Sequence, residues 1–196
     1  MSDIVNDYIN GLIKAHKEKN KDINLITHAS ENEIKRIRNL YPDVPEDFID
    51  FISKTDGVTV DKDGFSHRPS LFSIYEGHVT YRMVSINEII HDAESGDITL
   101  AEIYPWFLDE DADDDESACV EMDLHARIGD RILFAENSGV YALYIDLKPS
   151  KLGTVGQIIS YVHDPDSYSL VCNSFSDLLK QSVDSDFKYF FSEFDE

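Results

Sequence analysis

The residues of this chain most able to bind a ligand form one acidic run at positions 109–116. The run consists of Asp109, Glu110, Asp111, Asp113, Asp114, Asp115 and Glu116 around a single alanine. Numbered from Asp109 as an EF-hand calcium loop, it places oxygen ligands at Asp111, Asp113 and Asp115. However, Asp114 occupies the position of the turn glycine, and Val120 that of the bidentate glutamate. We therefore expect a solvated or partner-facing acidic loop, with loose binding of a divalent ion as the alternative.

Histidine and cysteine, the usual ligands of zinc, are scattered along this chain. The 7 histidines occur one at a time, at positions 16, 28, 67, 78, 91, 125 and 163, and Cys119 and Cys172 have no CxxC spacing. A zinc site needs such ligands clustered at a regular spacing. We expect no metal and no cofactor, and we interpret the cysteines as two reduced, buried thiols.

The patterns that could support catalysis are incomplete. No GxSxG nucleophile elbow occurs, and no nucleophile signature surrounds Cys119. His163-Asp164 is followed by Pro165-Asp166, which is typical of a turn with side-chain caps rather than of an acid–base pair. Gly153-Thr154-Val155-Gly156 lacks the Lys-Ser/Thr of a phosphate-binding loop, so its glycines indicate sharp backbone turns. The sequence predicts no catalytic residues and a protein that is not an enzyme.

The composition favours a partner of opposite charge. The chain has 196 residues, with 39 Asp and Glu against 17 Lys and Arg, and a formal net charge of −22. Such a protein repels phosphate backbones and anionic membranes, so we expect it to bind neither nucleic acid nor a membrane. It attracts a cationic protein, although solubility alone also favours acidic surfaces. The absence of a signal-like start and of a bilayer-length apolar segment leads us to expect a cytoplasmic location.

Three helices can be placed by their start signals and apolar stripes. Residues 3–19 carry an apolar stripe with acids early and lysines late, the order that the helix dipole favours. Ser30 with Glu33, and Ser85 with Glu88, are capping boxes that precede apolar residues at helical spacing.

A fourth helix and several short strands lie between these segments. Pro45 can occupy the first turn of a helix at residues 46–54, and Gly57 is its expected left-handed stop. Strand candidates follow at residues 58–60, 71–75 and 79–84, the last two joined by a turn signal at Glu76-Gly77.

The C-terminal stretch predicts a sheet with a helix packed behind it. Residues 140–147 alternate between apolar and polar positions, and Pro149 ends that strand by removing a backbone donor. Residues 157–162 are rich in β-branched and aromatic side chains, and Ser174 with Asp177 starts a closing helix. The length and the absence of linkers or repeats predict a single domain over residues 1–196.

Two blocks of this sequence resemble the SUKH superfamily, named for the fungal cell-wall-synthesis regulator and its bacterial relatives. The first block, residues 30–57, has the capped helix, a proline-flanked connection before the second helix and a glycine stop. The second block, residues 132–180, is similar to the family signature through Asp146-Leu147-Lys148-Pro149, Gly153-Thr154-Val155-Gly156-Gln157-Ile158, His163-Asp164 and Ser174-Phe175-Ser176-Asp177-Leu178-Leu179. Residues 1–25 and about 60–125 lie outside the resemblance.

The resemblance implies an α+β fold in a single domain, with a twisted, mostly antiparallel sheet flanked by helices, and it implies no catalysis. Bacterial members are similar to immunity proteins, which bind and neutralise the toxin domains of polymorphic or contact-dependent systems. The implied partner is therefore a cognate protein toxin, and the charge of this chain favours a basic nuclease domain. The alternative is a regulatory protein-interaction scaffold like the fungal regulator.

The partner-binding residues are expected in an acidic elaboration at residues 83–126, which contains no Lys or Arg. Within it we expect the acidic run 109–116 to face the partner and Trp106 to act as an aromatic anchor. Packing of Trp106 in the core beside Pro105 and Phe107 is the alternative. A third interpretation is an enzyme hidden in this middle region, which would require a pocket with convergent carboxylates of perturbed pKa.

Overall fold

The protein is described by a computed structural model over residues 3–19, 21, 23–25, 27–60, 64–74, 79–109 and 117–191. The α-helices are α1 (Ile4–Glu18), α2 (Glu31–Leu40), α3 (Glu46–Lys54), α4 (Ile86–Ser95), α5 (Leu100–Ile103) and α6 (Phe175–Asp184), and the 3₁₀ helices include η2 (Pro105–Leu108), η3 (Ile128–Asp130) and η4 (Lys188–Phe190). The strands are β1 (Thr59–Val60), β2 (Ser66–His67), β3 (Ser70–Ile74), β4 (Val79–Met83), β5 (Ser117–Ala118), β6 (Arg131–Asn137), β7 (Tyr141–Asp146), β8 (Gln157–Val162) and β9 (Ser167–Cys172).

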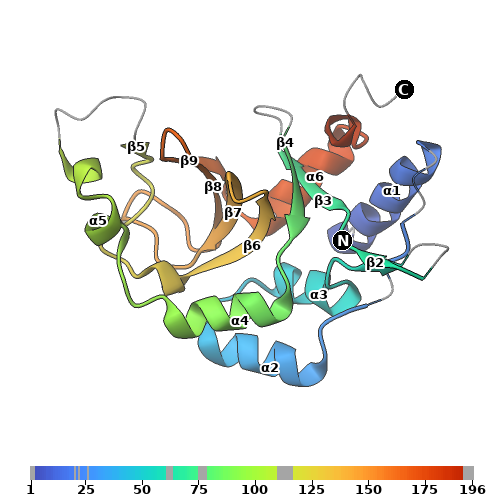
Figure 1. The fold of residues 1–196 in the computed structure, drawn as a ribbon, viewed down its shortest axis with the longest axis horizontal. Helices are drawn as coiled ribbons and strands as arrows, with labels where there is room; N and C mark the ends of the chain where they lie inside the picture. Colours follow the sequence, from blue (N-terminus) through green and yellow to red (C-terminus); the bar gives the residue numbers. More distant parts are fainter. Residues whose placement is uncertain are drawn as a thin grey trace.

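Seven strands form one sheet in the order β3-β4-β6-β7-β8-β9-β5. All neighbouring pairs run antiparallel except β5 and β9, which are parallel. Figure 1 shows the sheet flanked by helices, with α2 and α4 side by side below it, α1 beside α6, and α5 at the opposite end. The predicted α+β fold with a twisted, mostly antiparallel sheet is confirmed.

The helix starts follow the local signals in the sequence. Ser30 and Ser85 each accept a hydrogen bond from the backbone N–H three residues later, and the side chains of Glu33 and Glu88 accept from the serine N–H groups. Each box satisfies backbone donors that the first helical turn leaves unpaired. Asp3 caps α1 in the same way, through the N–H of Asn6. Along the described residues, no helix is long and apolar enough to cross a bilayer.

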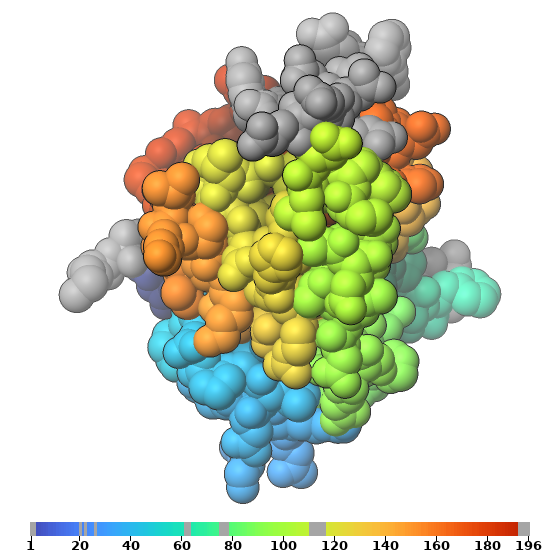
Figure 2. Space-filling model, turned by 90° about the vertical axis from the view of Figure 1, so that its left-hand side faces the viewer, coloured from blue at the N-terminus to red at the C-terminus, as the bar shows by residue number. Residues whose placement is uncertain are grey.

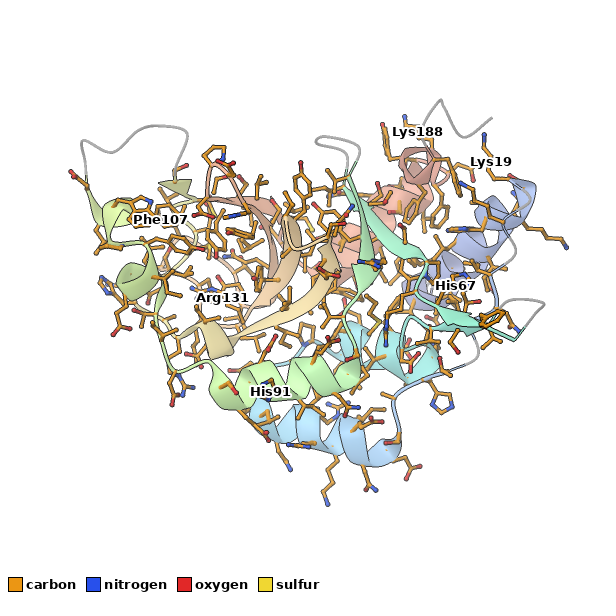
Figure 3. All side chains as sticks on the ribbon, viewed as in Figure 1. Lys19, His67, His91, Phe107, Arg131 and Lys188 are labelled. Carbon is orange, nitrogen blue, oxygen red and sulfur yellow. The ribbon has the colours of Figure 1, made fainter. Side chains whose placement is uncertain are left out.

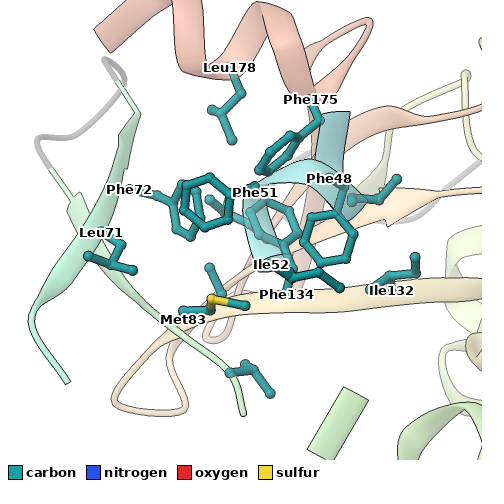
Figure 4. Close-up of a cluster of buried hydrophobic side chains, with 14 of the residues drawn as sticks. Phe48, Phe51, Ile52, Leu71, Phe72, Met83, Ile132, Phe134, Phe175 and Leu178 are labelled. Carbon is teal, nitrogen blue, oxygen red and sulfur yellow. The ribbon is translucent and has the colours of Figure 1, made fainter. Parts of the chain in front are cut away.

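A cluster of five phenylalanines forms the centre of the main core. They come from four elements: Phe48 and Phe51 from α3, Phe72 from β3, Phe134 from β6, and Phe175 from α6. The ring centroids of Phe72 and Phe134 are 5.1 Å apart, and those of Phe48 and Phe175 are 5.2 Å apart, both edge to face. Figure 4 shows these rings together between the strands and the two helices. This cluster joins both blocks of the sequence resemblance in one core.

Several local expectations need correction or fall outside the description. Pro45 is the N-cap of α3 instead of a first-turn residue, because its ψ of 137° is extended. Gly57 has the expected positive φ, 81°, which favours glycine. The turn predicted at Glu76-Gly77 lies outside the described residues. Strand β9 and the α5–η2 segment were not predicted.

Candidate functional site

The sheet has two faces with different surroundings. Side chains alternate along a strand, so in β7 Leu143 and Ile145 belong to the main core while Tyr144 projects to the opposite side. Tyr161 of β8 and Tyr168 of β9 share that side with Tyr144. We call this side the open face, because α3 and α6 contribute their buried side chains to the other one.

Four tyrosines gather on the open face. Tyr161 and Tyr168 lie directly opposite each other on β8 and β9, with ring centroids 4.8 Å apart, and the ring of Tyr144 is 6.3 Å from that of Tyr168. Tyr104, which directly follows α5, completes the set, with its hydroxyl 3.4 Å from that of Tyr161. We refer to these four residues as the tyrosine cluster. Burial raises the pKa of Tyr144 to about 12, so its hydroxyl is neutral near pH 7.

Two cavities meet at this cluster. The larger has a volume of about 470 Å³ and extends over β4, β6 and β7 as far as α4. The smaller, about 180 Å³, lies under Tyr104 and is lined by Arg131 and Tyr168. Tyr144 and Tyr161 line both cavities, so the open face carries a continuous groove with aromatic walls. Tyrosine offers an apolar ring and a polar tip, which suits a protein interface.

Charged side chains surround the larger cavity. Its cations are Arg68 and Arg82, and its carboxylates are Glu88, Asp92 and Glu136. Arg82 pairs with Glu136 at 3.3 Å across β4 and β6. Glu88 is engaged in the α4 capping box, which lowers the pKa of its carboxyl. Most of these charges therefore already have partners within the fold.

The signature residues of the second block hold the segment around residue 121 against the sheet. Asp146 is fully buried and accepts hydrogen bonds of 3.1 Å from the Lys148 N–H and from the side-chain amide of Gln157. The same amide donates to the backbone oxygen of Glu121, also at 3.1 Å. A Cβ at Gly153 would lie 2.4 Å from that oxygen, so only glycine allows the two segments to approach this closely. The signature glycine and glutamine thus fasten the segment around residue 121 to the sheet.

Arg131 anchors the residues that directly follow this segment, around Asp123. Its guanidinium is nearly buried, donates to the backbone oxygen of Asp123 at 2.6 Å, and has its Nε 3.4 Å from Oδ1 of Asp146. Burial raises the pKa of Asp146, while the guanidinium beside it acts in the opposite direction. Figure 3 shows Arg131 and Phe107 both on the α5 side of the sheet. We infer that these signature residues form a structural clamp.

Both ends of the acidic run are attached to the open face. On the N-terminal side, Phe107 packs edge to face on Tyr168, with ring centroids 6.2 Å apart. On the C-terminal side, Ser117 pairs with Ser167 of β9, and the Cys119 N–H donates to the Tyr168 oxygen at 2.9 Å. In Figure 2, which faces α5, the α5–η2 segment (light green) lies against the yellow segment that leads into β6.

The predicted partner-binding residues divide between the described and undescribed parts of the chain. Trp106 and Asp109 are described, whereas Glu110, Asp111, Asp113, Asp114, Asp115 and Glu116 lie outside the described residues. Trp106 is 40% exposed and contacts Tyr104 edge to face, with ring centroids 5.5 Å apart. Its indole is therefore not a core residue, and the core-packing alternative is wrong.

The other chemical candidates occupy structural positions. His163 pairs with Asp166 at 3.0 Å within the turn between β8 and β9, which raises the pKa of the imidazole. Both cysteines are free and partly buried, and burial raises the pKa of Cys119 to about 11 and that of Cys172 to about 12. Such thiols are poor nucleophiles near neutral pH. Within the described ranges, no group of three or more His, Cys, Asp or Glu residues could hold a metal ion.

Sequence reasoning missed the tyrosine cluster. Its members come from four segments, residue 104 and strands β7, β8 and β9, and no spacing in the sequence connects them. A partial signal was available, since Tyr144 occupies a polar-side position in the alternating stretch 140–147, and Tyr161 lies in the predicted strand 157–162. Tyr104 directly follows α5, which was not predicted, and no sequence pattern indicated where this tyrosine docks.

A model of the SMI1/KNR4 family (SUKH-1) matches residues 28–181. The match covers well over half of the 196 residues, and the chain belongs to this family. The match also runs through residues 60–125, so the expectation that this region lies outside the resemblance was wrong. Helix α1 precedes the matched region. No curated protein matches the chain in a comparison by sequence.

Proposed function

We propose that this protein is a non-catalytic immunity protein that binds and neutralises a cognate toxin domain, a basic nuclease, in the cytoplasm of the producing cell. The observation that carries the proposal is the open face, where Tyr168 lines the aromatic groove and also contacts the segments at both ends of the acidic run. Membership of the SUKH-1 family, which includes immunity proteins, supports this assignment. The net charge of −22 supports a basic partner.

The proposed interface combines two kinds of contact. The exposed part of Trp106 and the rings of the tyrosine cluster supply aromatic anchors of the kind that dominate binding energy. The acidic run supplies negative potential, which accelerates encounter with a basic surface and competes with the phosphates of a nuclease substrate. We assign Asp109, Glu110, Asp111, Asp113, Asp114, Asp115 and Glu116 to this second role.

The enzyme interpretation has weaker support. The larger cavity contains three carboxylates, but Glu88 caps a helix and Glu136 pairs with Arg82, which leaves Asp92 as a single carboxylate without a catalytic partner. A regulatory interaction scaffold is the second candidate function, favoured by the SMI1/KNR4 description of the matched family. The same open face would then bind a regulatory protein.

Co-expression with the basic C-terminal domain of a secreted protein encoded next to this chain tests the proposal. We expect the chain to restore growth and to bind that domain directly. Converting Asp111, Asp113, Asp114 and Asp115 to asparagine should leave the fold intact and lower the association rate at low ionic strength, by roughly tenfold or more.

A matched control converts four exposed acids elsewhere, Glu18, Glu31, Asp43 and Asp184, to their amides. It changes the net charge equally and should reduce the association rate far less. No protection and no binding would refute the immunity function. Equal effects of the two quadruple variants would refute the role of the acidic run and leave the immunity function standing.

A further inference from the structure

Asp92 is the carboxylate of the open-face groove that forms neither a hydrogen bond nor an ion pair within the described residues. It projects from α4 four residues after Glu88, lines the 470 Å³ cavity, and is only partly exposed. No hydrogen bond or ion pair joins its side chain to the rest of the described chain. Burial raises the pKa of its carboxyl, and the neighbouring His91 acts in the opposite direction without cancelling that shift. A partly buried carboxylate without a hydrogen bond or an ion pair is costly to keep unless something binds to it.

The surroundings of Asp92 are aromatic. Tyr144 and Tyr161 line the same cavity, and Tyr144 is close enough for the charge of Asp92 to contribute to the raised pKa of its hydroxyl. The π face of a tyrosine ring attracts cations, most strongly where water is excluded. A carboxylate beside such rings forms a site for a planar cation.

The two arginines of the cavity do not supply this cation. Arg82 of β4 is already paired with Glu136 of β6, at 3.3 Å. Arg68 is held by backbone oxygens, with its Nη1 2.7 Å from the oxygen of Asp56 and 3.2 Å from that of Met83. The charge of Arg68 also acts on Glu88 and helps to lower the pKa of that carboxyl. Among the charged residues that line the larger cavity, Asp92 is therefore the carboxylate that remains available to a cation from outside.

We propose that the open-face groove receives one arginine side chain from the protein partner, with its guanidinium against the carboxylate of Asp92 and stacked on the ring of Tyr144. This inference rests on the proposed function, and it adds the chemistry that a partner must present at this point. A guanidinium fits better than an ammonium because it is planar, stacks on aromatic rings and binds a carboxylate through two parallel hydrogen bonds.

The test uses the full chain with ¹³C-labelled tyrosine and N-acetyl-arginine amide as the probe. We expect saturable shifts of the Tyr144 and Tyr161 ring signals. N-acetyl-citrulline amide, which has nearly the same shape but no charge, should bind about tenfold more weakly or not at all. Asp92→Asn should weaken binding of the arginine probe by a similar factor, whereas Asp43→Asn, an equal charge change at an exposed residue outside the groove, should not.

Two outcomes would overturn the inference even if Asp92→Asn failed to fold. One is the absence of saturable shifts with the arginine probe at about 100-fold molar excess over the protein. The other is equal binding of the arginine and citrulline probes. Toxin neutralisation without binding of the arginine probe would leave the proposed function standing and remove only the arginine site. Binding of the probe without any neutralised partner would refute the proposed function and leave a guanidinium site.

Discussion

The buried pair of Arg131 and Asp146 is predicted to be a major determinant of stability. Asp146→Ala removes a fully buried carboxylate together with the acceptor of the Lys148 N–H and of the Gln157 amide. It also leaves the Arg131 guanidinium, which is 4% exposed, without its counter-charge. Removing one partner of a buried ion pair costs about 3–5 kcal/mol, because the remaining charge stays desolvated.

A double-mutant cycle separates the interaction between Arg131 and Asp146 from the other losses of unfolding free energy. Arg131→Met, which keeps much of the side-chain volume, should cost a similar amount because Asp146 is then the unpaired charge. In the double variant neither charge remains, so the sum of the single losses should exceed the double loss by about 1–3 kcal/mol. A domain of this kind has roughly 5–15 kcal/mol of stability, so the single variants should still fold.

Urea unfolding followed by far-UV circular dichroism and by the fluorescence of the single tryptophan measures these free energies. Asp97→Ala is the control, because Asp97 pairs with Arg127 on the surface and is 92% exposed, and no measurable change is expected. Single variants that lose less than about 1 kcal/mol, or that add without coupling, would refute the clamp interpretation.

Three further predictions concern single side chains. Burial holds the pKa of His16 below its ordinary value of 6.5, so the imidazole binds a proton more readily in the unfolded chain than in the folded one. The free energy of unfolding should therefore fall as the pH drops below about 6.5. His16→Phe should flatten that dependence, measured by urea unfolding at pH 5.5 and 7.5. Gly153→Ala should cost about 1–3 kcal/mol by forcing Cβ against the Glu121 oxygen, and an unchanged urea midpoint would contradict that contact. Ser85→Ala should cost about 1 kcal/mol through the α4 cap, measured the same way and compared with an exposed serine-to-alanine change outside any helix start.

The local elements of the fold were predictable because their signals lie within a few residues. In a capping box two residues three positions apart each accept a hydrogen bond from the other's backbone N–H, as at Ser30 and Glu33, so the whole signal lies within one helical turn. Alternation likewise located a strand at residues 140–147, and β-branched and aromatic residues located one at 157–162; the structure contains β7 and β8 there. The four-residue helix α5 also begins with a capping box, Thr99 with Glu102, which was overlooked, whereas the two-residue strand β5 is too short to show a pattern.

The site was less predictable because it depends on pairing between distant segments. Trp106 was selected as a partner contact from its position beside the acidic run, and the structure places it partly exposed at the edge of the tyrosine cluster. The groove itself depends on the register of β8 with β9, which sets Tyr161 opposite Tyr168, and on the docking of Tyr104 from a segment over fifty residues earlier. Register and docking are decided by packing over the whole sheet.

The sequence by itself determined the acidic charge, the helix starts, the main strands and the family, because each is recorded in residue types at short, regular spacings. It also marked Asp146, Gly153 and Gln157 as a signature without saying what they do. Only the tertiary structure decided that role, a clamp on the segment around residue 121. It also decided that Asp92 lines a cavity together with Tyr144 and Tyr161, because the environment of a side chain is set by neighbours that the sequence places far away.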